Sequence, residues 1–210
     1  VSGSATIFSK LSAVLRSDRE LALAAVKRDG FMLSCVEDQL KFDREVAMCA
    51  VRTGPVLQYV PLELRNDHQV VRAAVAFDGT MLQHASREMR EERSIVLTAV
   101  KSNGFSIVYA SGKFRRDPEV VLEAVQTSGS VLQYVSPELR NDRRIALAAI
   151  RSNASALVFV ASRLQTPRFC LAAVRGNSLA MEFVPKQLKR YPGLLWLQHV
   201  KRRRLSNANS

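Results

Sequence analysis

Residues 117–141 read DPEVVLEAVQTSGSVLQYVSPELRN, and versions of this stretch recur along most of the 210-residue chain. Seven copies of just under 25 residues each fill residues 18–190. They begin at Asp18, Asp43, Asp67, Glu92, Asp117, Asp142 and Thr166. Self-similarity at a fixed period of this length predicts a repeat protein, in which each copy buries its apolar face against its neighbours.

Each copy opens like an amphipathic helix. The opening Asp predicts an N-cap, because its carboxylate can accept the free amides of the first helical turn. Apolar residues then fall three, four, seven and eight positions after the start, which is one face of a helix. We expect a first helix of about ten residues, followed by one or two shorter helical pieces. Alternation typical of strands is absent, so the predicted fold class is an all-α solenoid of seven stacked repeats.

Small residues occupy two recurring columns. A Gly follows the first helix in five copies, where we expect it to end the helix in a left-handed conformation. These are Gly30, Gly54, Gly79, Gly104 and Gly129. An Ala fills one column in all seven copies, at Ala25, Ala50, Ala74, Ala99, Ala124, Ala149 and Ala173. A side chain that is always small predicts a close crossing of neighbouring helices there.

The pattern D-x-E-V-x-L-x-A-V, followed by Gly and a PELR-like turn, resembles the tandem repeats of domain of unknown function 4116. The resemblance covers residues 18–190 and is best in copies four to six. The chain departs from the pattern at Arg72, Ala154, Thr166 and Ser178. The resemblance implies a helical repeat with an interaction role, and it brings no catalytic residue with it.

The segments that flank the copies are predicted to cover the two ends of the stack. Residues 1–17 carry apolar side chains at helical spacing and are predicted to form an N-terminal capping helix. Residues 191–200 are predicted to cap the last copy through Trp196 and its Leu neighbours. The alternative is that Leu195 and Trp196 form a patch for a partner helix. Residues 201–210 form a basic tail without apolar periodicity.

The net charge of +12 is distributed unevenly. Residues 18–91 hold 10 basic and 12 acidic residues, and residues 92–141 hold 6 and 5. Residues 142–190 hold 9 basic residues and only 2 acidic ones, and the tail adds four more cations. Unbalanced charge of one sign repels itself and is typical of a surface that meets an anionic partner.

The residues predicted to contact that partner lie in copies six and seven and in the tail. They are Arg143, Arg144, Arg151, Arg168, Arg175, Lys186, Lys189, Arg190, Lys201, Arg202, Arg203 and Arg204. Basic residues also recur at the end of the first helix and at the end of each copy. Near a helix C-terminus a cation gains roughly 0.3–1 kcal/mol without any ligand, which explains these two columns in copies one to five. It does not explain the scarcity of acids in copies six and seven.

The predicted anionic partner is RNA, because Arg outnumbers Lys here and its planar guanidinium matches phosphate oxygens. The repeat pattern places Phe159, Phe169 and Phe183 in the core, so we expect contact with phosphates rather than stacking on bases. Two alternatives stay open. The KRRR run at residues 201–204 fits a nuclear address, and an acidic protein surface also fits the charge.

The sequence carries no recognisable catalytic or metal-binding constellation. The three His residues stand alone, without a second ligand at metal spacing. Cys35, Cys49 and Cys170 are predicted to be buried thiols. The recurring carboxylates are explained as helix starts, and a Gly-rich phosphate loop is missing. We therefore expect no enzymatic activity, no cofactor, no metal and no small-molecule substrate.

These features favour a non-catalytic scaffold of a large ribonucleoprotein assembly, in its sharpest form a mitochondrial ribosome. Its basic C-terminal end would contact rRNA phosphates and neighbouring proteins. The alternatives are a protein-binding solenoid of a non-RNA complex and a fragment of a bacterial effector.

The expected compartment is reducing, because three scattered Cys residues do not make a disulfide framework. We expect the mitochondrial matrix, with the nucleus or the cytoplasm as alternatives. Since the chain begins with Val, a removed targeting leader stays open. Apolar runs of about eighteen residues are absent, so no membrane span is expected.

Overall fold

The computed structural model describes residues 16–199, and all regular structure in that range is helical. The predicted all-α solenoid is confirmed, and each of the seven copies contributes three helical elements. The first element of each copy is an α-helix of ten residues. These first helices are α3 (Arg19–Arg28), α5 (Arg44–Thr53), α6 (His68–Phe77), α8 (Arg93–Ser102), α9 (Pro118–Thr127), α11 (Arg143–Ser152) and α12 (Pro167–Gly176).

Two shorter elements follow each first helix. The second is always a 3₁₀ helix: η1 (Gly30–Cys35), η2 (Leu57–Tyr59), η4 (Gly79–His84), η5 (Gly104–Val108), η7 (Gly129–Tyr134), η8 (Ala154–Phe159) or η10 (Ser178–Phe183). The third is a short α or 3₁₀ helix: α4 (Asp38–Lys41), η3 (Leu64–Asn66), α7 (Arg87–Glu91), η6 (Gly112–Arg116), α10 (Pro137–Arg140), η9 (Ser162–Leu164) or η11 (Leu188–Arg190).

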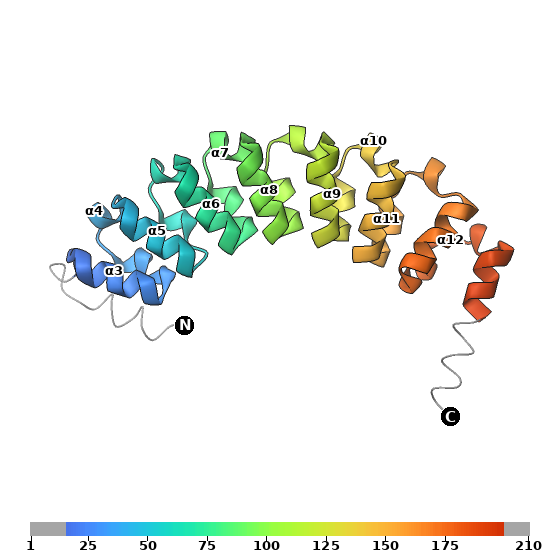
Figure 1. The fold of residues 1–210 in the computed structure, drawn as a ribbon, viewed down its shortest axis with the longest axis horizontal. Coiled ribbons are helices and arrows are strands. Elements are labelled where there is room, and N and C mark those ends of the chain that lie inside the picture. Colours follow the sequence, from blue (N-terminus) through green and yellow to red (C-terminus); the bar gives the residue numbers. More distant parts are fainter. Residues whose placement is uncertain (1–15, 200–210) are drawn as a thin grey trace, which may run out of the picture. The chain divides into compact units, whose positions relative to one another are not determined.

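The chain divides into two compact units, residues 1–112 and 113–210. In the first unit α3 packs on α5, α5 on α6, and α6 on α8. In the second unit α9 packs on α11, and α11 on α12. Among the 3₁₀ helices η2 packs on η4 and η4 on η5, and in the second unit η7 packs on η8 and η8 on η10. Each unit thus has a layer of first helices and a layer of 3₁₀ helices, as Figure 1 shows.

The core of each unit lies between these two layers. The apolar face predicted for the first helices is the buried one, and in α9 it consists of Val120, Val121, Ala124 and Val125. The 3₁₀ helix of the same copy adds Val131 and Leu132. Burial of such side chains is the main stabilising contribution, at roughly 1.5–3 kcal/mol for each fully buried Val or Leu.

The predicted N-caps are confirmed at the five opening Asp residues, and Glu92 and Thr166 cap their helices in the same way. The side chain of each starting residue accepts a backbone N–H from the first turn of its helix. Asp67, for example, accepts the N–H groups of Gln69 and Val70 at 2.9 and 3.0 Å. Even Thr166, which replaces the usual Asp, accepts the N–H of Phe169 at 3.3 Å.

The predicted left-handed Gly at the end of the first helix is wrong. Among the described residues none has a positive φ. In α11 the helix ends at Asn153, whose backbone is extended at φ −145° and whose N–H donates to the carbonyl of Ala149 at 2.8 Å. At Gly30, Gly79 and Gly129 Gly is needed for a different reason, which is close approach between copies. A Cβ on Gly129 would collide with the carbonyl oxygen of Ala149 in the next copy, and Gly79 faces the carbonyl of Ala99 in the same way.

The Ala column forms the other side of this contact. Six of its seven members are at most 1% exposed: Ala50, Ala74, Ala99, Ala124, Ala149 and Ala173. Ala25 in copy one is half-buried. At Ala50, Ala99 and Ala149 the carbonyl oxygen faces the Gly of the copy before, which is consistent with the predicted close approach.

One polar column was missed by sequence reasoning. The residue just before the Gly position ends the first helix through its backbone N–H, and its side chain also begins the 3₁₀ helix. Its oxygen accepts the N–H two residues later at Asp29, Asp78, Asn103, Asn153 and Asn177. Short Asp and Asn side chains make this turn readily, so a recurrent Asp or Asn at the end of a helix could have revealed it.

The two ends of the chain are described only in part. Apart from Arg16 and Ser17, the predicted N-terminal capping helix lies outside the described residues, and so does the basic tail at 201–210. In the predicted C-terminal cap, residues 192–199 are helical. Leu194 is fully buried there, whereas Trp196 is 63% exposed.

Candidate nucleic-acid interface

Two adjacent helices of the second unit, α11 and α12, bring five of the predicted contact residues together. Arg144 and Arg151 are seven residues apart and therefore lie on one face of α11. Arg168 and Arg175 repeat that spacing on α12. Arg143 is the first residue of α11. All five side chains are exposed, and α11 packs on α12. We call these five residues the arginine face.

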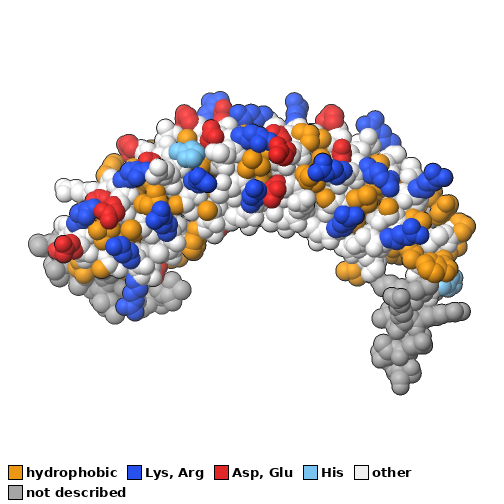
Figure 2. Space-filling view, viewed as in Figure 1, with side chains coloured by type: hydrophobic (Ala, Val, Ile, Leu, Met, Phe, Trp, Pro, Cys, Tyr) orange, Lys and Arg blue, Asp and Glu red, His pale blue; other side chains and the backbone are white. Residues whose placement is uncertain are grey.

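Arg151 extends from α11 toward the end of α12. A Cβ placed on Gly176, the last residue of α12, would lie 3.4 Å from Cγ and 3.5 Å from Nε of Arg151. The Arg151 side chain therefore lies beside Gly176, which directly follows Arg175 in the sequence. Figure 2 shows the resulting distribution, with Lys and Arg side chains spread over the surface of α11 and α12.

The arginine face lacks compensating carboxylates. Neither α11 nor α12 contains Asp or Glu, whereas α3 and α5 carry Glu20 and Glu45 in their first turns. The carboxylate of Asp142, which precedes α11, caps the helix by accepting the N–H of Ile145 at 2.9 Å. Within the described part of the chain, the five arginines form no ion pair and donate no guanidinium hydrogen bond.

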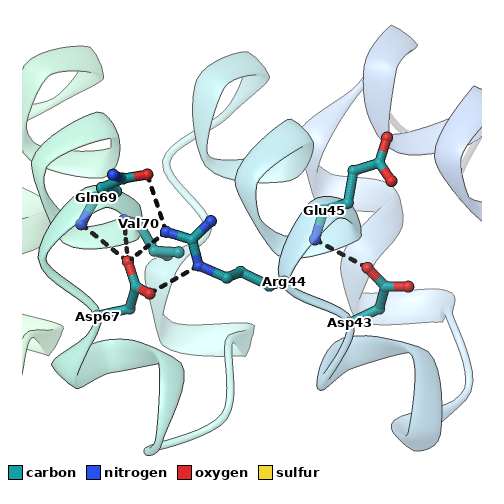
Figure 3. Close-up of polar contacts among 6 residues, drawn as sticks. All are labelled: Asp43, Arg44, Glu45, Asp67, Gln69 and Val70. Atoms are coloured by element: carbon teal, nitrogen blue, oxygen red, sulfur yellow. Dashed lines mark hydrogen bonds and ion pairs between the residues drawn. The ribbon is translucent and has the colours of Figure 1, made fainter.

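Arginines at the helix starts of the first unit are paired instead. Arg44, the first residue of α5, donates from Nε to Asp67 at 2.8 Å and from Nη2 to Asp67 and Gln69 at 3.1 and 3.0 Å (Figure 3). Arg19, the first residue of α3, donates to Asp43 at 2.6 Å. Each arginine thus bonds to the capping Asp of the next copy, and its charge is neutralised within the protein.

These links shift the ionisation of both partners. The hydrogen bond from Arg19 holds the pKa of Asp43 below its usual value, and the hydrogen bond from Arg44 does the same to the pKa of Asp67. In return, Asp67 raises the pKa of Arg44. The composition shows the same difference between the two units in how far acidic residues balance basic ones. The first unit holds 14 basic and 13 acidic residues, whereas the second holds 17 and 6.

Two members of the basic column at the end of each copy, Arg65 and Lys189, bond to backbone carbonyls. Arg65 donates from Nε to the carbonyl of Val60 and from Nη2 to that of Gln58, both at 2.6 Å. These carbonyls lie in and after the 3₁₀ helix of the same copy, where they have no partner further along the helix. Lys189 occupies the same column, and its Nζ donates to the carbonyl of Glu182 at 3.1 Å. Its ammonium group is therefore engaged within its own copy.

The remaining predicted contact residues lie elsewhere. Lys186 and Arg190 are exposed at the end of copy seven, before and within η11, and on neither helix of the arginine face. Lys201, Arg202, Arg203 and Arg204 lie outside the described residues. The structure thus brings together five of the twelve residues, and the prediction for all twelve as contact residues stays a prediction.

The predicted burial of the three Phe residues is correct only for Phe169, which is fully buried. Phe159 is half-buried and Phe183 is 37% exposed. Both stand at the last position of a 3₁₀ helix, where the turn of three residues directs the side chain to the edge of the layer. Aromatic surface is therefore accessible on the second unit.

The thiols also differ from the prediction in part. Cys170 is buried, and burial raises the pKa of its thiol. Cys35 and Cys49 are only half-buried. From residue 16 to residue 199, no cluster of His, Cys, Asp and Glu is arranged to hold a metal ion. In the same range, none of the helices has the length and apolar character needed to span a bilayer.

A family model described as "Domain of unknown function (DUF4116)" matches the chain four times, at residues 18–65, 43–90, 67–115 and 117–165. Each match spans two copies and begins at a copy start, which confirms the resemblance seen in the sequence. Together the matches cover more than half of the chain, and they end before copy seven. No curated protein and no solved structure matches the chain.

Proposed function

The chain belongs to the DUF4116 family, and we propose that it is a non-catalytic scaffold of a ribonucleoprotein assembly that binds RNA phosphates through the arginine face. The family description assigns no activity. The proposal therefore rests on the site itself.

One observation carries this proposal: five exposed arginines on two packed helices that contain no carboxylate. Like charges held together raise the free energy of the folded chain, and an anionic partner relieves that repulsion. The paired arginines of α3 and α5 show that the same fold can neutralise such positions internally. In copy seven both acceptor positions are replaced, by Thr166 and Arg168.

RNA is the polyanion that this surface suits best. Guanidinium groups bind phosphate oxygens in a bidentate fork. Arg144 and Arg151 are seven residues apart along α11, and Arg168 and Arg175 are seven apart along α12. Each separation corresponds to roughly 10 Å along the helix axis. Such a spacing can meet successive positions of a phosphate backbone but offers no means of reading bases. We therefore propose binding without sequence specificity, through shape and charge.

A second candidate function, protein binding, is favoured by the exposed apolar side chains of the second unit. Val158 and Leu179 are 61% and 55% exposed on η8 and η10. Exposed apolar side chains of this kind are typical of protein contacts where they form a continuous patch. In a ribonucleoprotein particle the two functions coexist, with neighbouring proteins on the 3₁₀ helices and RNA on the arginine face.

The identity of the particle is a narrower proposal. We place the protein in a mitochondrial ribosome, on the ground that such particles combine rRNA with many non-catalytic basic subunits. The mitochondrial matrix is the corresponding localisation. The compartment depends on no residue of the arginine face, so the binding test below is independent of it.

The test is a salt titration of RNA affinity with the whole chain and an unstructured RNA probe. If all five arginines contact phosphates, the logarithm of the association constant falls with the logarithm of salt at a slope of about −3.5. The variant R144Q/R151Q/R168Q/R175Q should flatten the slope by about 3 and bind at least about tenfold more weakly.

The matched control is K27Q/R52Q/R72Q/K101Q, which removes four cations from the first helices of the first unit. All four side chains are exposed. This variant loses the same charge, so it should keep most of the affinity if the arginine face is the site. Equal losses in both variants, or binding of the wild type that does not respond to salt, would contradict the proposal.

A further inference from the structure

The contact between copies six and seven retains an arginine whose intramolecular acceptors have been replaced. We infer that a backbone phosphate of the bound RNA occupies the place of those acceptors, held by Arg143 and Arg168. This inference rests on the proposed function and names the position on the arginine face where binding is strongest.

The first unit shows what such a contact looks like when it is complete. The first residue of one first helix donates to the Asp that caps the next, and also to the residue two positions after that Asp. From α3 to α5 the donor is Arg19, and its acceptors are Asp43 and Glu45 at 2.6 Å each. From α5 to α6 the acceptors are Asp67 and Gln69. A guanidinium at this position thus has two acceptors in the next copy.

From α11 to α12 the donor is present and both acceptors are changed. Arg143 is the first residue of α11, like Arg19 in α3. The capping residue of α12 is Thr166, and the residue two positions later is Arg168 instead of Glu or Gln. Thr166 still caps the helix, so the substitution removes the charge but preserves the helix start.

At this contact Arg143 has a cation–π contact with the Phe169 ring, but no carboxylate of the described residues takes the place of the missing acceptors. Cζ of Arg143 lies 5.8 Å from the ring centre of Phe169, which is fully buried. Arg143, Arg144 and Arg168 form no ion pair with any residue between 16 and 199. The guanidinium groups of Arg143 and Arg168 therefore stand at a position where copies two and three place a carboxylate.

A phosphodiester fits this position better than a protein carboxylate does. Its two unesterified oxygens can accept from the guanidinium groups of Arg143 and Arg168 at once, whereas in the first unit Asp43 and Glu45 both accept from the single guanidinium of Arg19. Arg is the residue that proteins favour for phosphate recognition, because its planar guanidinium matches the phosphate oxygens. An acidic protein segment is the competing occupant, and the test separates the two.

The decisive variant is Thr166→Asp, which supplies the acceptor that five of the seven copies contain. Asp at this position should engage Arg143 as Asp67 engages Arg44, and so compete with the phosphate. We expect RNA affinity to fall about tenfold and the salt slope to flatten by about 1. The melting temperature should be no lower than that of the wild type, because Asp is a strong N-cap.

Two matched controls separate the site from a general charge effect. Thr166→Asn keeps an N-cap without charge and should bind RNA like the wild type. Gln126→Glu adds the same single charge to an exposed position of α9 in the same unit, and it should weaken binding about twofold at most. If Thr166→Asp binds RNA no more weakly than either control, the inference is wrong.

The outcomes also distinguish this inference from the proposed function. If the wild type binds RNA with a steep salt dependence and Thr166→Asp has no specific effect, only the inference fails. If the wild type does not bind RNA, both fail. If the wild type binds a polyglutamate probe more tightly than RNA, and Thr166→Asp weakens that binding, the occupant is an acidic protein segment and the RNA assignment is overturned.

Discussion

Gly129 lies where the backbone of copy five meets the backbone of copy six. A methyl group there would collide with the carbonyl oxygen of Ala149 and come within 2.8 Å of the Asn153 nitrogen. Since both groups belong to the end of α11, neither can move without displacing the helix. We expect Gly129→Ala to lower the free energy of unfolding by about 1–3 kcal/mol, measured by chemical denaturation.

Gly176→Ala is the matched control for this prediction. A Cβ at Gly176 would meet only the flexible side chain of Arg151, at 3.4 Å, and Ala is favoured over Gly within a helix by about 1 kcal/mol. Its stability should be unchanged or higher. Similar losses in the two variants would show that the contact with Ala149 does not determine the need for Gly.

Arg65 is a second residue whose role is internal to the fold. Its guanidinium donates to the carbonyls of Gln58 and Val60. Arg65→Met preserves the aliphatic stem but leaves both carbonyls without that donor, at an expected cost of about 1–3 kcal/mol. Arg72→Met, at an exposed residue of the same unit without such bonds, should cost less than about 0.5 kcal/mol. Equal melting temperatures for the two variants would contradict the assigned role.

At the scale of residues, the sequence predicts what depends on local contacts. A cap such as Asp67 bonds to amides two and three residues away, so its role follows from the helix start alone. The role of Gly129 does not, because the group that excludes a side chain comes from Ala149, twenty residues later. The predicted left-handed conformation was the local explanation for a contact that is in fact between copies.

The helix starts of the first unit connect one element to the next through charge. Because Asp43 and Asp67 have lowered pKa values when folded, folding favours their ionised form. The stability that they contribute is complete above the ordinary carboxyl pKa of about 4 and is lost as the pH falls through the lowered values.

We therefore expect D43N/D67N to flatten the acid limb of the stability curve. Asn can still cap α5 and α6, so the variant isolates the loss of charge. The melting temperature of the wild type should fall more between about pH 5 and pH 2.5 than that of the variant. Because both pairs are partly exposed and screened by solvent, the wild type and the variant should differ little in stability at neutral pH. Identical acid limbs would exclude these carboxylates as the groups that titrate.

At the scale of elements, the first helices could be predicted because ten residues are enough to show a helical period. The elements after them could not be assigned a type, since η2, η3 and α4 have only three or four residues. The arginine face was predictable for the same reason as the first helices. Residues seven apart, such as Arg144 and Arg151, share a helix face. Lys189 was included by charge alone, and its bond to Glu182 was not foreseeable.

At the scale of the whole molecule, the repeat period predicts the stacking but not the two compact units. The boundary falls at Gly112, within the third element of copy four, and the copies continue through it with unchanged length. The separation of charge was visible in the composition. Its structural basis was not, because it depends on which helix starts have an acidic partner in the next copy.

The central claim is that RNA lies on the arginine face, and photo-crosslinking of the whole chain to RNA tests it most directly. The crosslinked peptides should come mainly from residues 143–151 and 167–176, and the R144Q/R151Q/R168Q/R175Q variant should lose them. Crosslinks spread over α3, α5, α6 and α8 in proportion to their basic residues, and unchanged by that variant, would contradict the account.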